Sequence, residues 1–223
     1  MYTRTQLLIG KENLNKIKNS KIIVFGVGGV GGYVCEMLVR AGVNNLTIVD
    51  FDKVDKTNLN RQIIALNSTI GKFKVDVMKQ RLLDINPKLN ITVFNEMYTP
   101  ENSNKFFKED YDFVIDAIDM VSSKVHLIKT AKDNHLNIVS AMGAGNRYQV
   151  PNFVVEDIFK THNDGLAKVM RKKLKEQGIE NLNVVYTSQD SYSFEGQVGS
   201  ISYFPAMCGC VIAAFVVNEI IKK

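Results

Sequence analysis

The sequence predicts an α/β protein with a Rossmann-like, mostly parallel sheet, helices on both faces and an extended C-terminal appendage. Three observations point to this class. Short runs rich in Val and Ile alternate with segments of helical periodicity. A glycine-rich stretch, VFGVGGVGG, follows the first such run and precedes the first such helix. The chain has 223 residues, which is enough for one large core. Strands that alternate with helices pair in parallel because each helix carries the chain back across the sheet.

The elements of the first half follow one another regularly. The expected strands are residues 22–25, 46–49, 91–94, 113–115 and 138–140. The expected helices are residues 30–40, 73–84 and 125–133. The second helix should end before Asn86-Pro87, because the residue before a proline disfavours helical backbone.

After Gly145 the alternation changes. We expect a single domain over residues 1–223, with a nucleotide-binding core (1–145) and an appendage (146–223) that returns to the core. The elements expected in the appendage are strands at 153–155 and 184–186, a basic helix at 160–177, a polar loop at 188–200 and a last helix at 206–221 after Pro205.

Composition restricts the location and the partners. The hydrophobic share of 45% and the charged share of 23% are ordinary for a soluble globular protein. The N-terminal segment lacks an apolar core of signal-peptide length, so we expect a cytoplasmic protein. The most apolar stretch, residues 208–221, is too short to span a membrane, and we expect a buried helix there and no integral membrane segment; membrane contact is the alternative. A net charge of +5 permits an anionic partner.

The chain has only three cysteines, Cys35, Cys208 and Cys210. Three cysteines do not form a disulfide framework in a protein of this size. There is no pair of Cys-x-x-Cys motifs, so we expect no structural zinc site.

The glycine-rich stretch is the first candidate site. Gly26, Gly28, Gly29 and Gly31 follow a predicted strand and open a predicted helix, where backbone N–H groups and the helix N-terminus can bind phosphate. Asp50 lies nineteen residues beyond Gly31 at the end of the second predicted strand, where a carboxylate can accept ribose hydroxyls. The alternative is a glycine turn that serves only helix–sheet packing.

Residues 50–120 favour ATP over a dinucleotide used for hydride transfer. Asn58, Arg61 and Lys74 follow the ribose carboxylate, and nucleotidyl transfer needs such groups because charge builds on the α-phosphate and the leaving pyrophosphate. Asp116 and Asp119 follow the fourth predicted strand, and Asp119 is the candidate ligand for Mg²⁺. Taken singly, Lys74 could be a solvated helix lysine and Asp119 a helix N-cap.

At these positions the chain resembles the ubiquitin-activating-enzyme-like superfamily. The matching residues are Gly26-x-Gly28-Gly29-x-Gly31, Asp50-Phe-Asp52, Asn58-Leu-Asn-Arg61-Gln62, Lys74 and Asp116-x-x-Asp119, with Arg4 ahead of the first strand. The resemblance implies ATP and Mg²⁺ as cofactors. It implies that Asp50 binds ribose, that Asn58, Arg61 and Lys74 bind phosphates, and that Asp119 binds Mg²⁺. It also implies a homodimer, in which Arg4 enters the ATP site of the partner subunit.

Two features depart from the members that activate ubiquitin-like sulfur carriers. The zinc-binding cysteines are missing, and no cysteine lies between Cys35 and Cys208, where many members carry one on a crossover loop. Met120 stands where those members have asparagine. These departures weaken the interpretation that the protein is an adenylyltransferase acting on the C-terminus of a sulfur carrier. We keep that function as the first alternative and a non-catalytic nucleotide-binding partner protein as the second.

The second half resembles one branch, the tRNA threonylcarbamoyladenosine dehydratases. The matching features are Lys124, the Gly143-Ala-Gly145 turn, Lys160-Thr161 and GSISYFPAMCG at 199–209. The resemblance implies ATP-dependent cyclisation of a threonylcarbamoyl group on tRNA by adenylation of its carboxylate. It leaves open a monovalent cation near the last segment and partner proteins that transfer sulfur.

A basic segment supports an RNA partner. Its basic residues are Lys160, Lys168, Arg171, Lys172, Lys173 and Lys175. Four of them, at 168, 171, 172 and 175, should share one helix face and bind tRNA phosphates, although a solvated face is the alternative. Tyr148, Phe159 and Tyr192 are candidates for base stacking, although such aromatic residues more often pack at the core or its rim.

Overall fold

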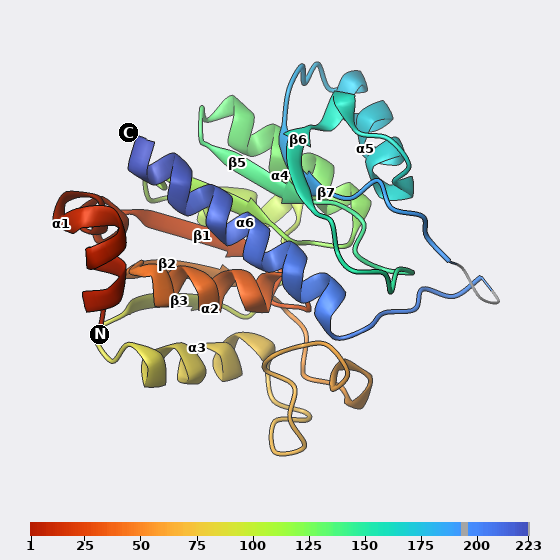
Figure 1. Cartoon of the computed structure of the whole chain (residues 1–223). Coiled ribbons are helices and arrows are strands. Elements are labelled where there is room, and N and C mark those ends of the chain that lie inside the picture. Colours follow the sequence, from red (N-terminus) through yellow and green to blue (C-terminus); the bar gives the residue numbers. More distant parts are fainter. Residues whose placement is uncertain (193–195, 223) are drawn as a thin grey trace.

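A seven-stranded sheet forms the centre of the molecule (Figure 1). The computed structural model describes residues 1–192 and 196–222; positions 193–195 of the expected polar loop lie outside this part. The strands are β1 Lys21–Phe25, β2 Asn45–Val49, β3 Asn90–Phe94, β4 Phe113–Asp116, β5 Ile138–Ala141, β6 Val154–Asp157 and β7 Asn183–Tyr186. The helices are α1 Thr3–Asn19, α2 Gly31–Ala41, α3 Lys74–Ile85, α4 Val121–Asp133, α5 Gly165–Glu176 and α6 Tyr203–Lys222, with 3₁₀ turns η1 Lys56–Asn58, η2 Pro100–Lys105 and η3 Ile158–Lys160.

The strand order, β3-β2-β1-β4-β5-β7-β6, confirms the predicted mostly parallel sheet. Only β6 runs antiparallel, against β7. In the middle, Val24 of β1 pairs with Ile48 of β2 on one side and Ile115 of β4 on the other. The chain crosses from β3 at one edge to β4 beside β1, so the order reverses between β1 and β4. In sheets of this kind, ligands bind outside the carboxyl ends of the strands at such a reversal.

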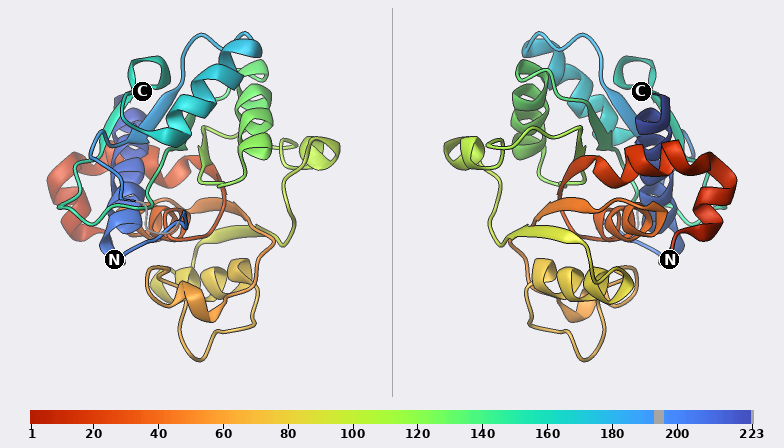
Figure 2. Two further views of the ribbon diagram at one scale, coloured as in Figure 1. Left: turned by 90° about the vertical axis from the view of Figure 1, so that its right-hand side faces the viewer. Right: turned by 90° about the vertical axis from the view of Figure 1, so that its left-hand side faces the viewer.

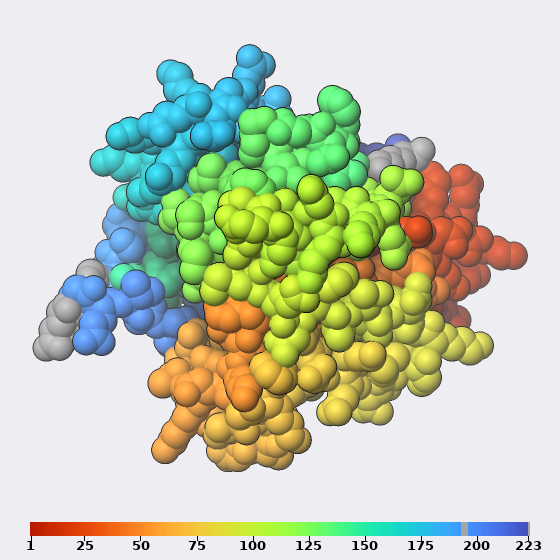
Figure 3. Space-filling view, turned by 180° about the vertical axis from the view of Figure 1, so that it is seen from behind, coloured from red at the N-terminus to blue at the C-terminus, as the bar shows by residue number. Residues whose placement is uncertain are grey.

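Helices cover both faces of the sheet (Figure 2). One apolar core joins the sheet to α2, α3 and α6, and the other joins it to α4, α5 and Phe106, which follows η2. The view from behind shows residues of about 95–135, in yellow-green and green, spread over the second face (Figure 3). Strands β6 and β7 extend the same sheet and α6 lies against α2, so residues 146–223 share the core with residues 1–145.

Helix α6 is longer than the sequence predicted. It has 20 residues, and its length and apolar composition satisfy the requirements of a membrane span. The expectation that this stretch is too short was therefore wrong. Half of it is buried within the protein. Gly209 permits the close approach to α2, because a Cβ there would lie 2.5 Å from the carbonyl oxygen of Val30. The apolar composition of α6 is therefore explained by its packing against α2, as in the core helix of a soluble protein.

Two other helices differ from expectation. Helix α1 was not predicted, because Gly10, at a φ of 84°, interrupts its periodicity. The basic helix begins at Gly165 rather than at residue 160, since the side chain of Asp164 accepts a hydrogen bond from the N–H of Ala167 and caps the helix. Lys160 lies in the preceding turn η3 and is not part of the helix.

Candidate functional site

A cavity of about 700 Å³ opens at the carboxyl ends of β1, β2 and β4, where the strand order reverses. Its volume lies in the range of small-molecule sites. The structure brings nine of the predicted site residues together around it: Gly26, Gly28, Gly29, Asp50, Asp52, Arg61, Gln62, Lys74 and Asp119. Gly31, Asn58 and Arg4 do not line it.

Three of the four glycines of the loop show two different roles. At Gly26 the φ is 90°, and a Cβ would lie 2.5 Å from the carbonyl oxygen of Ala117. At Gly31 a Cβ would lie 1.8 Å from the carbonyl oxygen of Gly26. Gly28, in contrast, faces the cavity and has only the amide of Gln62 within reach of an added Cβ, at 3.8 Å. Gly26 and Gly31 therefore allow the tight turn, and Gly28 leaves the floor of the cavity open beneath the N-terminus of α2.

Asp50 is hydrogen-bonded to the backbone of this loop. Its carboxylate is 9% exposed and accepts hydrogen bonds from the N–H of Val27 at 2.6 Å and of Asp52 at 2.8 Å. Burial raises the pKa of Asp50, although Lys74 and the two N–H groups oppose that shift. The carboxylate both shapes the loop and lines the cavity, where an unused lone pair can accept a hydroxyl.

Lys74 is the buried cation of the cavity wall. It is 6% exposed, and its ammonium donates to Asp52 at 2.7 Å. The side chain of Asp52 is 46% exposed, so it can move to water when an anion binds the ammonium. The helix position of Lys74 explains its placement, since α3 begins at this residue and its Nζ lies beside the end of β2.

Arg61 and Gln62 also line the cavity. The guanidinium of Arg61 donates to the carbonyl of Thr57 and the side chain of Asn60, both at 2.9 Å. Among the buried side-chain atoms of the described residues, the Oε1 of Gln62 is the one without a hydrogen-bond partner. An unsatisfied buried acceptor at a cavity wall indicates a place for a ligand or water.

The side chain of Asn58 takes part in the cap of turn η1. Its side-chain oxygen accepts from the N–H of Asp55, and the side chain of Asp55 accepts from the N–H of Thr57. Together they cap turn η1 and shape the segment that carries Arg61. Asn58 does not line the cavity, and its predicted phosphate contact stays a prediction.

The two carboxylates after β4 also divide their roles. Asp116 is fully buried and accepts hydrogen bonds from Lys124 at 2.8 Å, Ser140 at 2.5 Å and the N–H of Ile118 at 3.1 Å. Asp119 is exposed and lines the cavity. Of these two carboxylates, Asp119 is therefore the one that can contact a ligand or a metal. Within the described residues, no three His, Cys, Asp or Glu side chains gather as a metal site.

Two groups of cavity residues were not predicted. Glu96, Met97 and Tyr98 follow β3, and the strand-end position would have indicated them. Tyr98 lies edge-on to Phe25 with ring centroids 5.1 Å apart, which provides an apolar floor. The other group comes from the end of the core and from the appendage: Ala144, Gly145, Val198, Ser200 and Pro205. These residues are far away along the chain, so no local pattern reveals them.

Arg4 lies away from the cavity of its own chain. Helix α1 contacts the far ends of the helices that begin at the cavity: Tyr2 donates to the carbonyl of Val39, and Lys16 to that of Ile221. Helix α6 has 20 residues and is roughly 30 Å long. Figure 1 shows α1 at the end of the sheet opposite the start of α6.

The cysteines are not placed for nucleophilic chemistry. Cys35 and Cys208 are buried, and neither lines the cavity. Burial raises the pKa of Cys35 and raises that of Cys208 to about 12. At neutral pH both remain thiols, which are poor nucleophiles.

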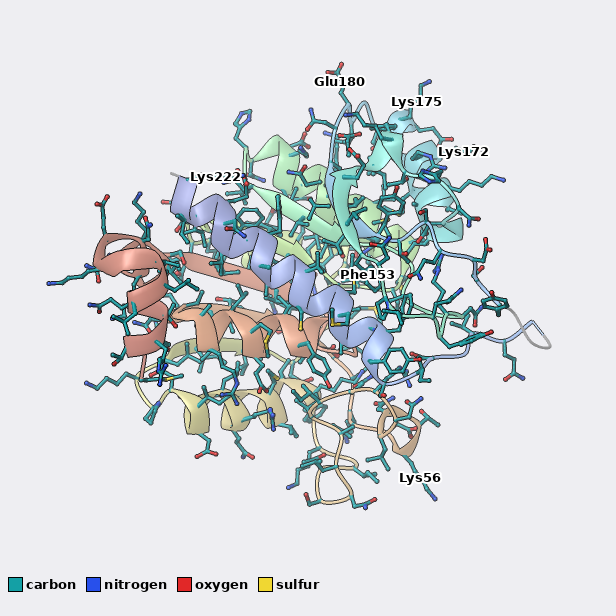
Figure 4. All side chains as sticks on the ribbon, viewed as in Figure 1. Lys56, Phe153, Lys172, Lys175, Glu180 and Lys222 are labelled. Carbon is teal, nitrogen blue, oxygen red and sulfur yellow. The ribbon has the colours of Figure 1, made fainter. Side chains whose placement is uncertain are left out.

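Helix α5 presents most of its predicted cations to solvent. Lys168, Lys172 and Lys175 are exposed, and Figure 4 shows Lys172 and Lys175 pointing away from the body. Arg171 differs, since its guanidinium turns inward and donates to the carbonyl of Thr161 at 2.9 Å. Arg171 is only partly exposed, because the preceding turn supplies acceptors for its guanidinium, and the predicted phosphate contact of all four cations stays a prediction.

Comparisons with known proteins agree with the geometry. The chain matches the ThiF family over residues 2–223. It is 38% identical over 240 residues to the tRNA threonylcarbamoyladenosine dehydratase of Bacillus subtilis, and the alignment covers 99% of this chain and 94% of that protein. The Escherichia coli protein of the same name is 39% identical over 171 residues; this alignment covers 77% of the chain and only 64% of that protein.

The structural likeness extends further. The crystal structure of the Escherichia coli dehydratase in complex with ATP superposes with a TM-score of 0.94 at 32% identity, over 99% of this chain and 93% of that chain. A complex of that enzyme with AMP matches equally well, with a TM-score of 0.94. The match over the full length, together with the cavity at the end of β1, shows that this chain belongs to the ThiF family.

Proposed function

We propose that this protein is an ATP-dependent dehydratase that cyclises threonylcarbamoyladenosine in tRNA. The observation that carries the proposal is the likeness to the dehydratases over both halves of the chain, including the appendage segments that complete the cavity. The wall of the cavity supplies the cations that adenylation needs. We also propose a cytoplasmic location, which suits a tRNA substrate.

ATP would lie with its phosphates over the glycine loop. Gly28 and the N-terminus of α2 would receive one phosphate, Asp50 a ribose hydroxyl, and Tyr98 the apolar face of the adenine. Lys74 would leave Asp52 and bind the phosphates together with Arg61. Mg²⁺ bound to ATP needs only one or two protein carboxylates, because phosphates and water complete its shell. Asp119 fits that requirement.

The reaction would proceed in two steps. A carboxylate oxygen of the threonyl group attacks the α-phosphorus, the bond to the bridging oxygen breaks, and pyrophosphate leaves. The carbamoyl group of the same side chain then attacks the acyl carbon, loses a proton and expels AMP, which keeps one former carboxylate oxygen. This intramolecular attack needs no enzyme nucleophile. The buried, protonated cysteines agree with that route. Partner proteins that transfer sulfur would act outside this reaction, since none of its steps uses sulfur.

Arg4 would act across a homodimer. It cannot reach the cavity of its own subunit, because α1 lies at the far ends of α2 and α6. We expect Arg4→Ala to be inactive and to recover activity when mixed with Lys74→Ala, since a heterodimer then contains one intact site. No recovery in verified heterodimers would contradict action across subunits.

The experiment that tests the function compares macromolecules. Purified protein with ATP and Mg²⁺ should release pyrophosphate when tRNA carrying threonylcarbamoyladenosine is added. It should release none with the unmodified transcript or with a sulfur-carrier protein that ends in Gly-Gly. Release with the carrier alone would instead support the adenylyltransferase alternative.

A further inference from the structure

A second cavity, of about 430 Å³, opens beside the nucleotide cavity. The two cavities share Val198 and Ser200 in their walls, and Gly145 of the first directly precedes Asn146 of the second. A molecule held in the second cavity can therefore extend a short side chain into the first. None of the ATP contacts proposed above uses this second space.

Two tyrosines form one wall of the second cavity. The rings of Tyr148 and Tyr192 have centroids 5.1 Å apart and planes inclined by 41°. They are 59% and 51% exposed, so their contact does not bury them in the core. Asn146 and Gln197 add amide groups to the same cavity. Aromatic faces beside polar donors and acceptors are the usual means by which proteins hold an unstacked base.

Hydrogen bonds to backbone groups hold this wall in place. Asn146, at a φ of 60°, donates from its N–H to the carbonyl of Gly199 at 2.8 Å and accepts from the N–H of Tyr192 at 2.6 Å. Its side-chain oxygen accepts from the N–H of Gly199 at 2.6 Å. The hydroxyl of Tyr203 donates to the carbonyl of Tyr148 at 2.5 Å. None of these bonds uses the side chain of Tyr148 or Tyr192, and both rings stay exposed among the residues that the structure describes.

The same loops are fastened to the start of α5. The carboxylate of Asp164, which caps α5, accepts from the N–H of Gly143 at 3.1 Å, and the side chain of Asn163 donates to the carbonyl of Ser188 at 2.8 Å. The start of α5 is therefore hydrogen-bonded to both loops that carry the tyrosine pair. RNA whose phosphates lie on α5 could direct an unstacked base toward the cavity.

We propose that the second cavity binds the adenine ring of the substrate nucleoside, with Tyr148 and Tyr192 as its stacking surface. This inference rests on the proposed function. Four bonds join N6 of the adenine to the carboxyl carbon of the threonyl group, which is a reach of roughly 5 Å. A ring in the second cavity thus places its carboxylate in the adjoining nucleotide cavity. The Gly-Gly end of a carrier protein would offer no ring to this wall.

The experiment measures binding of an anticodon stem-loop with threonylcarbamoyladenosine, and of the same stem-loop with an abasic site at that position. Tyr148→Ala and Tyr192→Ala should each weaken binding of the modified RNA about 5- to 150-fold, the factor that corresponds to removal of one base–aromatic stack. The two alanine variants should bind the abasic RNA with the same affinity as the wild-type protein does. The Tyr→Phe variants keep the ring and should bind like the wild type.

Val150→Ala is the matched control, since Val150 lies in the same loop, is 87% exposed and does not line the cavity. Retained ATP affinity shows that each variant is folded. Equal weakening for the modified and the abasic RNA would overturn the proposal, as would unchanged binding of both or weaker binding of a Gly-Gly peptide only. Failure of the proposed function is seen separately, as absence of pyrophosphate release by the wild type with modified tRNA.

Discussion

Two aspartate–lysine pairs lie on the same edge of the sheet and have different roles. Lys74 and Asp52 follow β2, and their charged atoms are 2.7 Å apart; Asp116 ends β4, Lys124 follows it in α4, and their charged atoms are 2.8 Å apart. The two pairs have the same chemistry and nearly the same distance, but they differ in exposure. The carboxylate of Asp52 is 46% exposed, whereas the side chains of Lys124 and Asp116 are both fully buried. The first pair can open to accept an anion, and the second fixes the strand end beside the cavity.

The largest expected effect is on stability and comes from the buried pair. Lys124→Ala leaves the carboxylate of Asp116 unpaired in the core, which typically costs about 3–5 kcal/mol. Lys74→Ala should cost much less, because Asp52 can turn to water. Urea unfolding of both variants measures the two free energies. Equal destabilisation would contradict the division between a structural and a functional pair.

The next largest effect is expected on the reaction rate. It concerns Lys74 of the exposed pair and Asp119, which both line the nucleotide cavity. Lys74→Ala and Asp119→Ala should each lower the turnover at least a hundredfold, since removing one transition-state contact costs about 3 kcal/mol. Their unfolding midpoints should stay close to that of the wild type. Steady-state pyrophosphate release with modified tRNA measures the rates. A folded Lys74→Ala protein with wild-type turnover would exclude Lys74 from the phosphate site.

Much of this site could be predicted from the sequence, and the reason is local. Gly28, Asp50, Lys74 and Asp119 each stand at a strand end or a helix start, positions that periodicity locates. The roles of neighbouring side chains could not be predicted, because they depend on partners: Asn58 satisfies a cap.

Two further limits are long-range. The inward turn of Arg171 depends on the carbonyl of Thr161, which only the folded turn η3 places there. Residues 198–205 reach the cavity from more than a hundred residues beyond β2, and no local pattern encodes that contact. The kink of α1 at Gly10 likewise concealed a helix whose apolar face is recognisable once the break is known.

A smaller effect is expected on tRNA binding from the lysines of α5. No ion pair holds Lys168, Lys172 or Lys175 within the described part of the chain, so they are free to contact phosphates. Changing the three to Glu should weaken tRNA binding and flatten the plot of log K against log salt by roughly 0.7–0.9 for each phosphate that is no longer neutralised. ATP affinity should not change. An unchanged slope would leave these lysines as a solvated face.

The smallest effect is expected from the cysteines. A variant with Cys35, Cys208 and Cys210 replaced by Ala should retain most of its activity, because the thiols stay protonated at neutral pH and two of them are buried. Product formation is measured by chromatography of digested tRNA. A folded triple variant that adenylates but forms no cyclic product would require a thioester step.

The central claim is that the substrate carboxylate itself is adenylated in the cavity at the end of β1. Modified tRNA with ¹⁸O in the threonyl carboxylate tests it directly. We predict that AMP recovered after one turnover carries one ¹⁸O atom and that the nucleoside is lighter by the mass of one labelled water. Unlabelled AMP beside a cyclised product would contradict this mechanism, since the carboxylate oxygen would then never have been bonded to phosphorus.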